Sequence, residues 1–226
     1  MAPRRLMENG VAAVGRALAI LGAFREGEAA LSLAELAART GLYKSTILRL
    51  LGTLEQGRCV ERQADARWAL GPMLFHWGSL YARAQPVERL LPAALQALAT
   101  ESGETASFWV RHGEQRLCLA RVRAPSPIRD DLAEGVLLAL PAGAGGRVLV
   151  APDPRALGVV ATFGERNPET AAIACAVFGT QGLAGALGIS GPRERVASRE
   201  DAHRATVASA AADLTRRLGG DLGVLA

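Results

Sequence analysis

Four side chains near residue 45 carry the groups that proteins use to hold nucleic acid. Lys44, Ser45, Thr46 and Arg49 stand close together and supply an ammonium, two hydroxyls and a guanidinium. Donors of this kind bind phosphate oxygens and base edges, and arginine can pair with guanine through two hydrogen bonds. Lys44 is also the only lysine in the chain. The segment therefore predicts a surface that contacts DNA.

A helix must position these donors, and the surrounding pattern predicts one. Apolar residues recur at helical spacing from Ile47 to Leu54, so one stripe faces a core while the donors lie opposite. Ser32 and Glu35 have the spacing of a capping box, which opens a shorter helix that ends at Gly41. Helix, brief turn and helix together form the motif that places a recognition helix in the major groove. A solvated face of a small helical domain remains the alternative, because amphipathic helices are common.

Two short strands after this helix predict a β-hairpin. Residues 59–62 and 67–70 flank a polar tip, as the strands of a wing would. Such a wing would lay Arg62 and Arg67 against the sugar-phosphate backbone. The side chains expected in the core of this winged helix-turn-helix are Val14, Leu18, Leu21, Phe24, Trp68 and Leu70.

Charge is distributed unevenly along the 226 residues. The formal net charge is +4 and the isoelectric point is near 9.5. Residues 1–85 hold 11 lysines and arginines against 7 acidic residues, whereas the remainder holds 15 of each. The whole excess thus lies on the half that is expected to bind DNA, as electrostatic steering to phosphate requires. A GC-rich genome would explain arginine in place of lysine, but it does not explain this asymmetry.

The second half of the chain changes to strands separated by turns. Residues 72–83 predict a linker helix whose apolar stripe packs either on its own core or on a partner subunit, and both interpretations remain open. A domain boundary follows near 84–86. The elements expected beyond it are a helix at 87–100, strands at 106–111, 116–122, 136–140, 172–178 and 183–189, and a final helix to about 218. Without βαβ alternation, this order predicts an α+β domain.

Neither a catalytic nor a metal-binding constellation is recognisable. The glycine-rich residues 142–147 lack the third glycine of the dinucleotide-binding motif; they fit either tight backbone packing or a helix start that holds a carboxylate. Ser190 has no histidine–aspartate pair to activate it. Arg129-Asp130-Asp131 is expected to be a solvated loop, and the histidines, which lack ligand spacing, are expected at the surface or hydrogen-bonded. We expect no enzyme activity, no cofactor and no metal.

Cysteine usage and hydropathy indicate a cytoplasmic protein. Cys59, Cys118 and Cys175 lie far apart without a CxxC pair, which suits reduced, buried thiols. No apolar run approaches the ~18 residues of a membrane span, and the first residues lack a signal core. Residues 1–10 are expected to form a flexible arm, with a minor-groove contact as the alternative.

A set of segments, taken together, resembles the IclR family of bacterial transcriptional regulators over about residues 9–220. The helix-turn-helix segments are the more specific half. The segments that carry the likeness are 41–46, 49–51, 54–57, 60–62, 70–72, 103–106, 116–119, 144–147 and 188–192. The shortened second domain is similar to the type of member associated with amino-acid biosynthesis genes, with which it shares a stretch like Gly164-Glu165-Arg166.

This resemblance implies a repressor or activator whose second, GAF-like domain senses a small metabolite. Carried over by position, Lys44, Ser45, Thr46 and Arg49 would face DNA. The effector-pocket positions implied in the same way are Ala144, Gly145, Thr162, Glu165, Ala172, Gly188 and Ser190. Thr162 and Ala172 replace an aspartate and a cysteine that many members carry, and Gly188 replaces one of a usual serine pair. Glu169 replaces a usual glycine, and several tens of residues before the following strand are missing.

The expected architecture is α+β, with an N-terminal winged helix-turn-helix at residues 11–71. A flexible arm at 1–10 precedes it, a linker helix at 72–85 follows, and a GAF-like effector-binding domain occupies 86–226. We expect a one-component regulator that binds double-stranded operator DNA as a homodimer, or a tetramer, without a membrane. Its effector is expected to bear a carboxylate, as an organic acid or an amino-acid-like molecule does, and to bind at the glycine-rich helix start and Ser190. The alternatives are a constitutive DNA-binding protein whose reduced second domain only oligomerises, and a small cytosolic enzyme.

Overall fold

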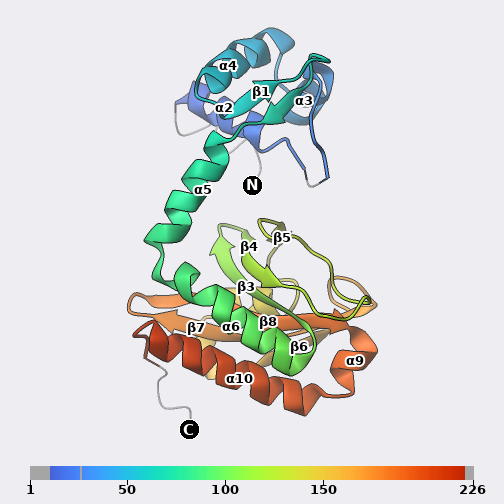
Figure 1. Cartoon of the computed structure of the whole chain (residues 1–226), viewed down its shortest axis with the longest axis vertical. Helices are drawn as coiled ribbons and strands as arrows, with labels where there is room; N and C mark the ends of the chain where they lie inside the picture. Colours follow the sequence, from blue (N-terminus) through green and yellow to red (C-terminus); the bar gives the residue numbers. More distant parts are fainter. Residues whose placement is uncertain (1–10, 26, 222–226) are drawn as a thin grey trace. The chain divides into compact units, whose positions relative to one another are not determined.

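The protein consists of two compact units, Met1–Ala84 and Gln85–Ala226, each with its own core (Figure 1). The computed structural model describes residues 11–25 and 27–221, so the arm expected at residues 1–10 lies outside the described residues. Helices and a hairpin form the first unit, and an antiparallel sheet with helices forms the second. The predicted α+β class with an N-terminal winged helix-turn-helix is confirmed.

The first unit has the predicted order of helices followed by a hairpin. Its elements are α2 (Ala12–Leu21), α3 (Leu33–Thr40), α4 (Lys44–Gln56), β1 (Val60–Arg62), β2 (Trp68–Leu70) and α5 (Met73–Ala84). Ser32 Oγ accepts a hydrogen bond from the Glu35 amide, and the Glu35 carboxylate accepts one from the Ser32 amide, which completes the capping box. Gly41 ends α3 with a φ of 69°, a left-handed conformation that favours glycine.

The core of this unit differs from the sequence prediction at three positions. Val14 and Leu18 are exposed, because α2 turns its other face inward and buries Gly15 and Ile20 instead. Leu70 was also expected inside but is 46 % exposed. Strand alternation decides which side a residue faces, but not whether another element covers that side.

One six-stranded antiparallel sheet organises the second unit, in the order β5-β4-β3-β8-β7-β6. Its strands are β3 (Thr105–His112), β4 (Gln115–Val122), β5 (Leu137–Ala139), β6 (Val160–Phe163), β7 (Thr170–Gly179) and β8 (Gly182–Pro192). The pairing of β3 with β8 joins two hairpins that are far apart in the sequence. β6 was not predicted, and β7 and β8 extend beyond their predicted ends.

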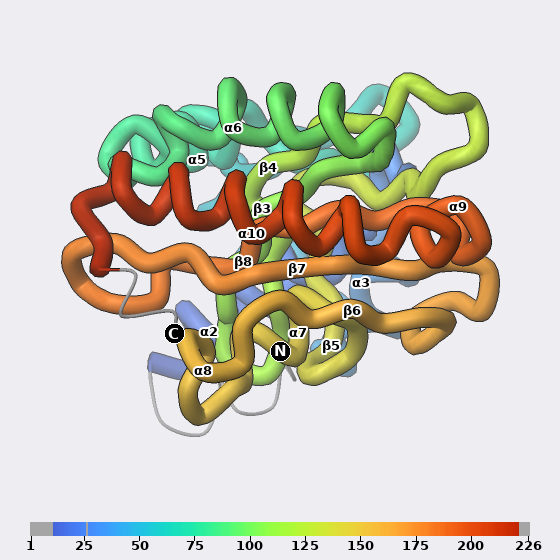
Figure 2. Tube along the Cα trace, turned by 90° about the horizontal axis from the view of Figure 1, so that it is seen from below, coloured from blue at the N-terminus to red at the C-terminus, as the bar shows by residue number. Residues whose placement is uncertain are grey.

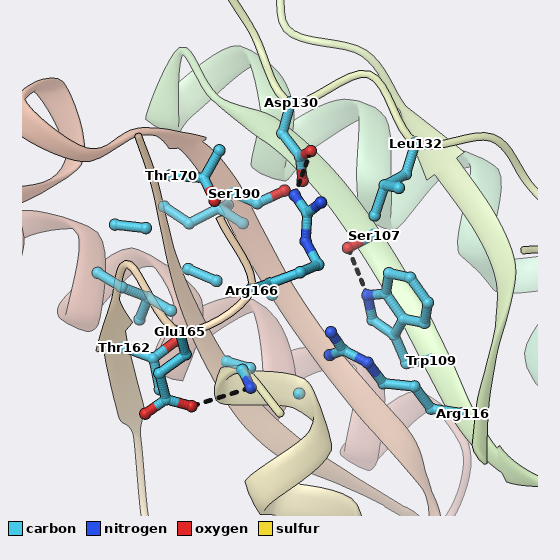
Figure 3. Close-up of a pocket in the computed structure, with 18 residues that line it drawn as sticks. Ser107, Trp109, Arg116, Asp130, Leu132, Thr162, Glu165, Arg166, Thr170 and Ser190 are labelled. Carbon is cyan, nitrogen blue, oxygen red and sulfur yellow. Dashed lines mark hydrogen bonds and ion pairs between the residues drawn. The ribbon is translucent and has the colours of Figure 1, made fainter. Parts of the chain in front are cut away.

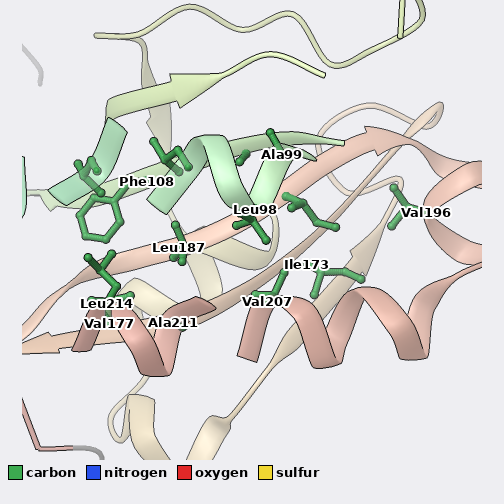
Figure 4. Close-up of a cluster of buried hydrophobic side chains, with 14 of the residues drawn as sticks. Leu98, Ala99, Phe108, Ile173, Val177, Leu187, Val196, Val207, Ala211 and Leu214 are labelled. Atoms are coloured by element: carbon green, nitrogen blue, oxygen red, sulfur yellow. The ribbon is translucent and has the colours of Figure 1, made fainter. Parts of the chain in front are cut away.

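Helices cover the two faces of this sheet differently. The long helices α6 (Pro86–Ser102) and α10 (Glu200–Arg217) lie on one face, and the short α7 (Ala144–Val150) lies on the other (Figure 2). Leucine, isoleucine, valine and phenylalanine side chains fill the layer under α6 and α10 (Figure 4). Along β7 and β8, Ile173 and Leu187 point into that layer, whereas Ala172 and Gly188 line a cavity toward α7. The two remaining helices are α8 (Pro154–Leu157) and α9 (Arg193–Ala197).

Buried reactive groups in the described part of the chain are few. The three cysteines are free thiols, and burial raises the pKa of Cys118 to about 11. His203 was expected at the surface or hydrogen-bonded, but it is buried and its Nε2 has no described partner. Burial, and then Arg199, lowers its pKa, so the neutral imidazole is favoured. Among the described residues no helix is long and apolar enough to cross a membrane, and no cluster of three potential metal ligands occurs.

Candidate DNA-binding surface and effector cavity

The exposed face of α4 carries the donors that the sequence singled out. Lys44, Ser45 and Arg49 are exposed and Thr46 is half-buried, and none of the four has a side-chain hydrogen bond or ion pair with another described residue. The opposite face anchors the helix, because Ile47 is completely buried in the core of the unit. The donors are therefore held on a packed helix while their polar groups remain available to a ligand.

Sequence reasoning missed two further exposed side chains on the same element. Tyr43 occupies the N-cap position of α4 and is 84 % exposed, and Leu48 is 49 % exposed. Leu48 lies one helical turn from both Lys44 and Gly52, so its spacing already placed it on this face. Its apolar character obscured the assignment. An aliphatic side chain there can contact a thymine methyl group.

A third extended segment, at Leu31, pairs with the wing and connects it to the helices. The two arginines of the wing differ in their contacts. Leu31 and Trp68 exchange two backbone hydrogen bonds of 2.7 Å. Arg62 is exposed, with its guanidinium 5.9 Å from the centre of the Trp68 ring. Arg67 instead turns toward the body of the unit, where its Nη2 donates to the Ala30 carbonyl at 2.6 Å. An internal acceptor thus engages one terminal nitrogen of Arg67, whose side chain is still 44% exposed, and its contact with the DNA backbone stays a prediction.

A cavity in the second unit lies between the sheet and α7, with a free volume of about 40 Å³ (Figure 3). Six of the seven predicted effector positions line it, namely Gly145, Thr162, Glu165, Ala172, Gly188 and Ser190. Ala144 does not line it: its side chain is fully buried and its amide donates to Thr162 Oγ1 at 3.0 Å. Positions from β6, β7, β8, α7 and a loop thus meet around one small space.

The glycine-rich start of α7 already holds a carboxylate from the chain itself. Glu165 accepts a hydrogen bond of 3.0 Å from the Gly143 amide and forms an ion pair with Arg147. Tight packing occurs as well, since a Cβ on Gly146 would lie 2.5 Å from the Pro141 carbonyl oxygen. Both sequence interpretations hold in part. The helix start expected to receive an effector is occupied by the side chains of Glu165 and Thr162.

Asp130 belongs to the cavity, which corrects the prediction that residues 129–131 form a solvated loop. Its side chain is 7 % exposed and forms ion pairs with Arg121 at 3.1 Å and Arg166 at 2.6 Å. Burial opposes ionisation of Asp130, but the two guanidinium groups outweigh it and lower the pKa of the carboxyl below 3.8. Adjacent Asp131 stays exposed, so position in the sequence alone did not distinguish the two.

Three further residues of the cavity were not foreseen. Trp109 donates from Nε1 to Ser107 Oγ at 2.8 Å, and the guanidinium of Arg116 lies 4.3 Å from the centre of the Trp109 ring. Strand alternation could have placed Ser107 and Trp109 on one face, but only the fold shows that this face meets α7. Burial, and then the nearby Arg166, lowers the pKa of Arg116 to about 10, so it remains a cation at neutral pH.

Comparison with known proteins assigns the first unit to a family. Residues 13–64 match the model of the IclR helix-turn-helix domain. The chain is 29% identical to the glycerol operon regulatory protein of Streptomyces coelicolor, with 96% of this chain and 98% of that protein covered. The chain is an IclR-family transcriptional regulator. Its relatives are named as regulators and repressors rather than enzymes.

Solved structures of other family members share the fold of the regulator. An IclR transcriptional regulator from Alicyclobacillus acidocaldarius superposes with a TM-score of 0.81 at 24% identity, covering 93% of this chain and 100% of that one. An IclR homologue from Microbacterium hydrocarbonoxydans, solved in complex with 4-hydroxybenzoate, gives a TM-score of 0.77 at 17% identity, covering 92% and 99%. At these identities the likeness concerns the fold alone.

Proposed function

We propose that this regulator binds operator DNA as a homodimer through α4 and that a small anion in the cavity modulates binding. The observation that carries the DNA-binding part is the set of exposed, unpaired donors on a helix that is packed as a recognition helix. Lys44, Ser45, Thr46 and Arg49 would contact bases and phosphates, and Arg62 would contact the backbone from the wing. The protein would act in the cytoplasm.

An apolar surface on the first unit supports the homodimer. No residue of α5 is buried, and Phe75, Trp77, Leu80 and Tyr81 are among its exposed side chains. Val14 and Leu18, the residues wrongly expected in the core, add to the exposed apolar surface of this unit. Covering such surface with a second copy contributes roughly 25 cal/mol per Å², from which the entropic cost of association is subtracted. A dimer would also present two recognition helices to two half-sites.

The dimer is tested by measuring mass in solution by light scattering. We expect the wild type to be a dimer at micromolar concentration and Trp77→Ser with Tyr81→Ser to shift it toward monomer. A double substitution at exposed polar positions of α10, Arg216→Ser with Asp213→Ser, serves as the matched control. A dimer that survives the α5 substitutions with unchanged affinity would exclude this surface as the interface.

DNA binding is tested with the DNA upstream of the regulator's own coding sequence against a scrambled sequence, at two salt concentrations. We expect tight, salt-dependent binding with a preference for the upstream DNA. Arg49→Ala should weaken it by about 1–3 kcal/mol if Arg49 reads a guanine, or reduce the salt slope by about one if it contacts phosphate. Arg216→Ala, an exposed arginine on α10, should leave binding unchanged. Equal affinity of wild type and Arg49→Ala for the upstream DNA would contradict the assignment.

Cationic groups around the cavity support an anionic effector. Arg116, Arg121 and Arg166 lie in or beside it, whereas Asp130 pairs with the last two only. The complex of a family member with 4-hydroxybenzoate supports a small-molecule site in this fold. The same DNA-binding assay, repeated with carboxylates at millimolar concentration, tests the effector. If DNA binding is tight but no carboxylate alters it, the second unit acts as an oligomerisation domain and the regulator is constitutive.

A further inference from the structure

Arg116 is a buried cation that forms no ion pair with any of the described residues. The residue is 6 % exposed, and its side chain makes no hydrogen bond or ion pair with any described group. Its Nε is buried and unpartnered, and its guanidinium carbon lies 4.3 Å from the centre of the Trp109 ring, at the cavity (Figure 3). Taking such a cation out of water without a partner costs several kcal/mol, so the fold retains it at a loss of stability.

No acid near the cavity is free to neutralise Arg116. Asp130 already serves two guanidinium groups, those of Arg121 and Arg166. Glu165 is engaged by Arg147 and by the Gly143 amide. The cavity region therefore holds more positive than negative charge, and the excess is concentrated at Arg116. A ligand that carries one negative charge at this point would restore the balance.

The backbone beside Arg116 is shaped to keep its guanidinium accessible. A Cβ on Gly145 would lie 2.9 Å from Arg116 Nη1, and a Cβ on Gly143 would lie 3.2 Å from Nη2. Glycine at both positions leaves room around the two terminal nitrogens, which are the donors that pair with a carboxylate. The ring of Trp109 lies against the guanidinium and restricts where those donors can lie.

We infer that Arg116 is the carboxylate receptor of the effector cavity and that it selects a short-chain aliphatic carboxylate. This inference rests on the proposed effector function and specifies its ligand class. The free volume of about 40 Å³ corresponds to roughly three water positions of 10–15 Å³ each. That space takes a carboxylate of about two to four carbons and no aromatic ring. The ligand would pair with the two terminal nitrogens of Arg116 beside Trp109.

Ser107 adds a preference within this class. Its Oγ accepts the hydrogen bond from Trp109 Nε1, so its own hydroxyl proton remains to be donated. Ser107 lines the cavity together with Arg116. A ligand with a hydroxyl or keto oxygen next to its carboxylate offers a further acceptor for that proton, whereas acetate has only its two carboxylate oxygens to share between Arg116 and Ser107. The expected order of affinity is therefore lactate above acetate.

Calorimetric titration of the full chain with lactate, acetate, lactamide and 4-hydroxybenzoate tests the inference. We expect lactate to bind, acetate to bind more weakly, and neutral lactamide and 4-hydroxybenzoate not to bind. Arg116→Met, which keeps a long unbranched side chain but removes the charge, should weaken lactate binding by about ten- to hundredfold. Arg123→Met is the matched control, because Arg123 is exposed, pairs with Asp131 and lies outside the cavity. It should bind lactate as the wild type does.

Thermal unfolding of the same variants distinguishes a ligand-binding role of Arg116 from a purely structural role. Without ligand, Arg116→Met should melt at or above the temperature of the wild type, because it removes an uncompensated buried charge. A large loss of thermal stability in Arg116→Met would overturn the inference. So would unchanged lactate affinity in that variant, tighter binding of 4-hydroxybenzoate than of lactate, or no binding of any carboxylate. In the first three cases the proposed regulation by a small anion could still hold; in the last, with DNA binding intact, the effector proposal fails as well.

Discussion

Arg49 in the first unit and Arg116 in the second both lack an ion pair among the described residues. Their surroundings differ, because Arg49 is in contact with water and Arg116 is buried in the protein. Arg49 is exposed on α4, where water solvates the guanidinium and a phosphate or base can replace that water. Arg116 is 6 % exposed and depends on the cavity for any partner. The described polar side chains that are buried, from Ser102 to Thr215, all lie in the second unit. Under the proposed function, the first unit would bind DNA at its surface and the second would bind an effector in its interior.

The largest effect is expected from removing Asp130, the buried acid that balances two arginines of the cavity. Asp130→Asn would leave Arg121 and Arg166 without their carboxylate beside the uncompensated Arg116. Removing one member of a buried ion pair leaves the remaining charges buried without compensation. We therefore expect the free energy of unfolding to fall by about 3–5 kcal/mol. Denaturant unfolding followed by circular dichroism measures this loss.

The neighbouring residue supplies the control for this experiment. Asp131 pairs with Arg123 and Arg129, but its side chain is 61% exposed. Asp131→Asn should therefore cost only about 0–1 kcal/mol. Equal losses in the two variants would show that burial does not distinguish these ion pairs.

Acid should reveal the same ion pairs without a mutation. The pKa of Asp130 in the folded protein lies below the ordinary 3.8, so its contribution to stability is complete above pH 3.8. That contribution is lost as the pH falls below this value through the depressed folded pKa. We expect the difference in melting temperature between wild type and Asp130→Asn to stay constant at about pH 6 and above, and to shrink below pH 4. A difference that does not change in acid would mean that Asp130 is not ionised in the folded protein.

The smallest effect is expected at the exposed surface of the first unit. Leu48 is about half exposed on α4, so Leu48→Ala should change the free energy of unfolding by less than about 0.5 kcal/mol. If its side chain contacts a thymine methyl, affinity for the preferred DNA should fall by about 1 kcal/mol, with no change for scrambled DNA. Fluorescence anisotropy with both DNAs measures the two affinities. An equal loss on both would assign Leu48 to a contact that does not depend on sequence.

Local patterns predicted much of the first unit because local interactions determine it. The capping box of Ser32 and Glu35 and the left-handed Gly41 involve residues close in sequence, and both occur as expected. The exposed donors of α4 follow from helical spacing in the same way. The failures at Val14 and Leu18 have a different cause. An apolar stripe shows that a face must be covered, but not whether the cover is the same chain or a second one.

The cavity was only partly predictable because pairings between distant segments build it. Six of its positions came from resemblance, and local patterns pointed only to the glycine-rich helix start and Ser190. Asp130 meets Arg166 across 36 residues, and Arg121 meets Ser190 across 69. Single-sequence patterns carry no information about such partners. The loop at residues 129–131 therefore looked solvated, although its middle residue is held inside by two arginines.

Two kinds of segment line the cavity, strands of the sheet and the connections between them. We expect the two to tolerate amino-acid substitutions differently during evolution. Strands β7 and β8 contribute small lining residues such as Ala172 and Gly188, and a side chain on Gly188 would collide with the Ile173 carbonyl, so these positions tolerate little variation. Other lining residues, among them the charged Asp130, Glu165 and Arg166, come from connecting segments. Connecting segments accept substitutions and insertions more readily than sheets do. Descendants or laboratory variants that recognise new effectors should therefore differ in the connecting segments while the sheet stays the same.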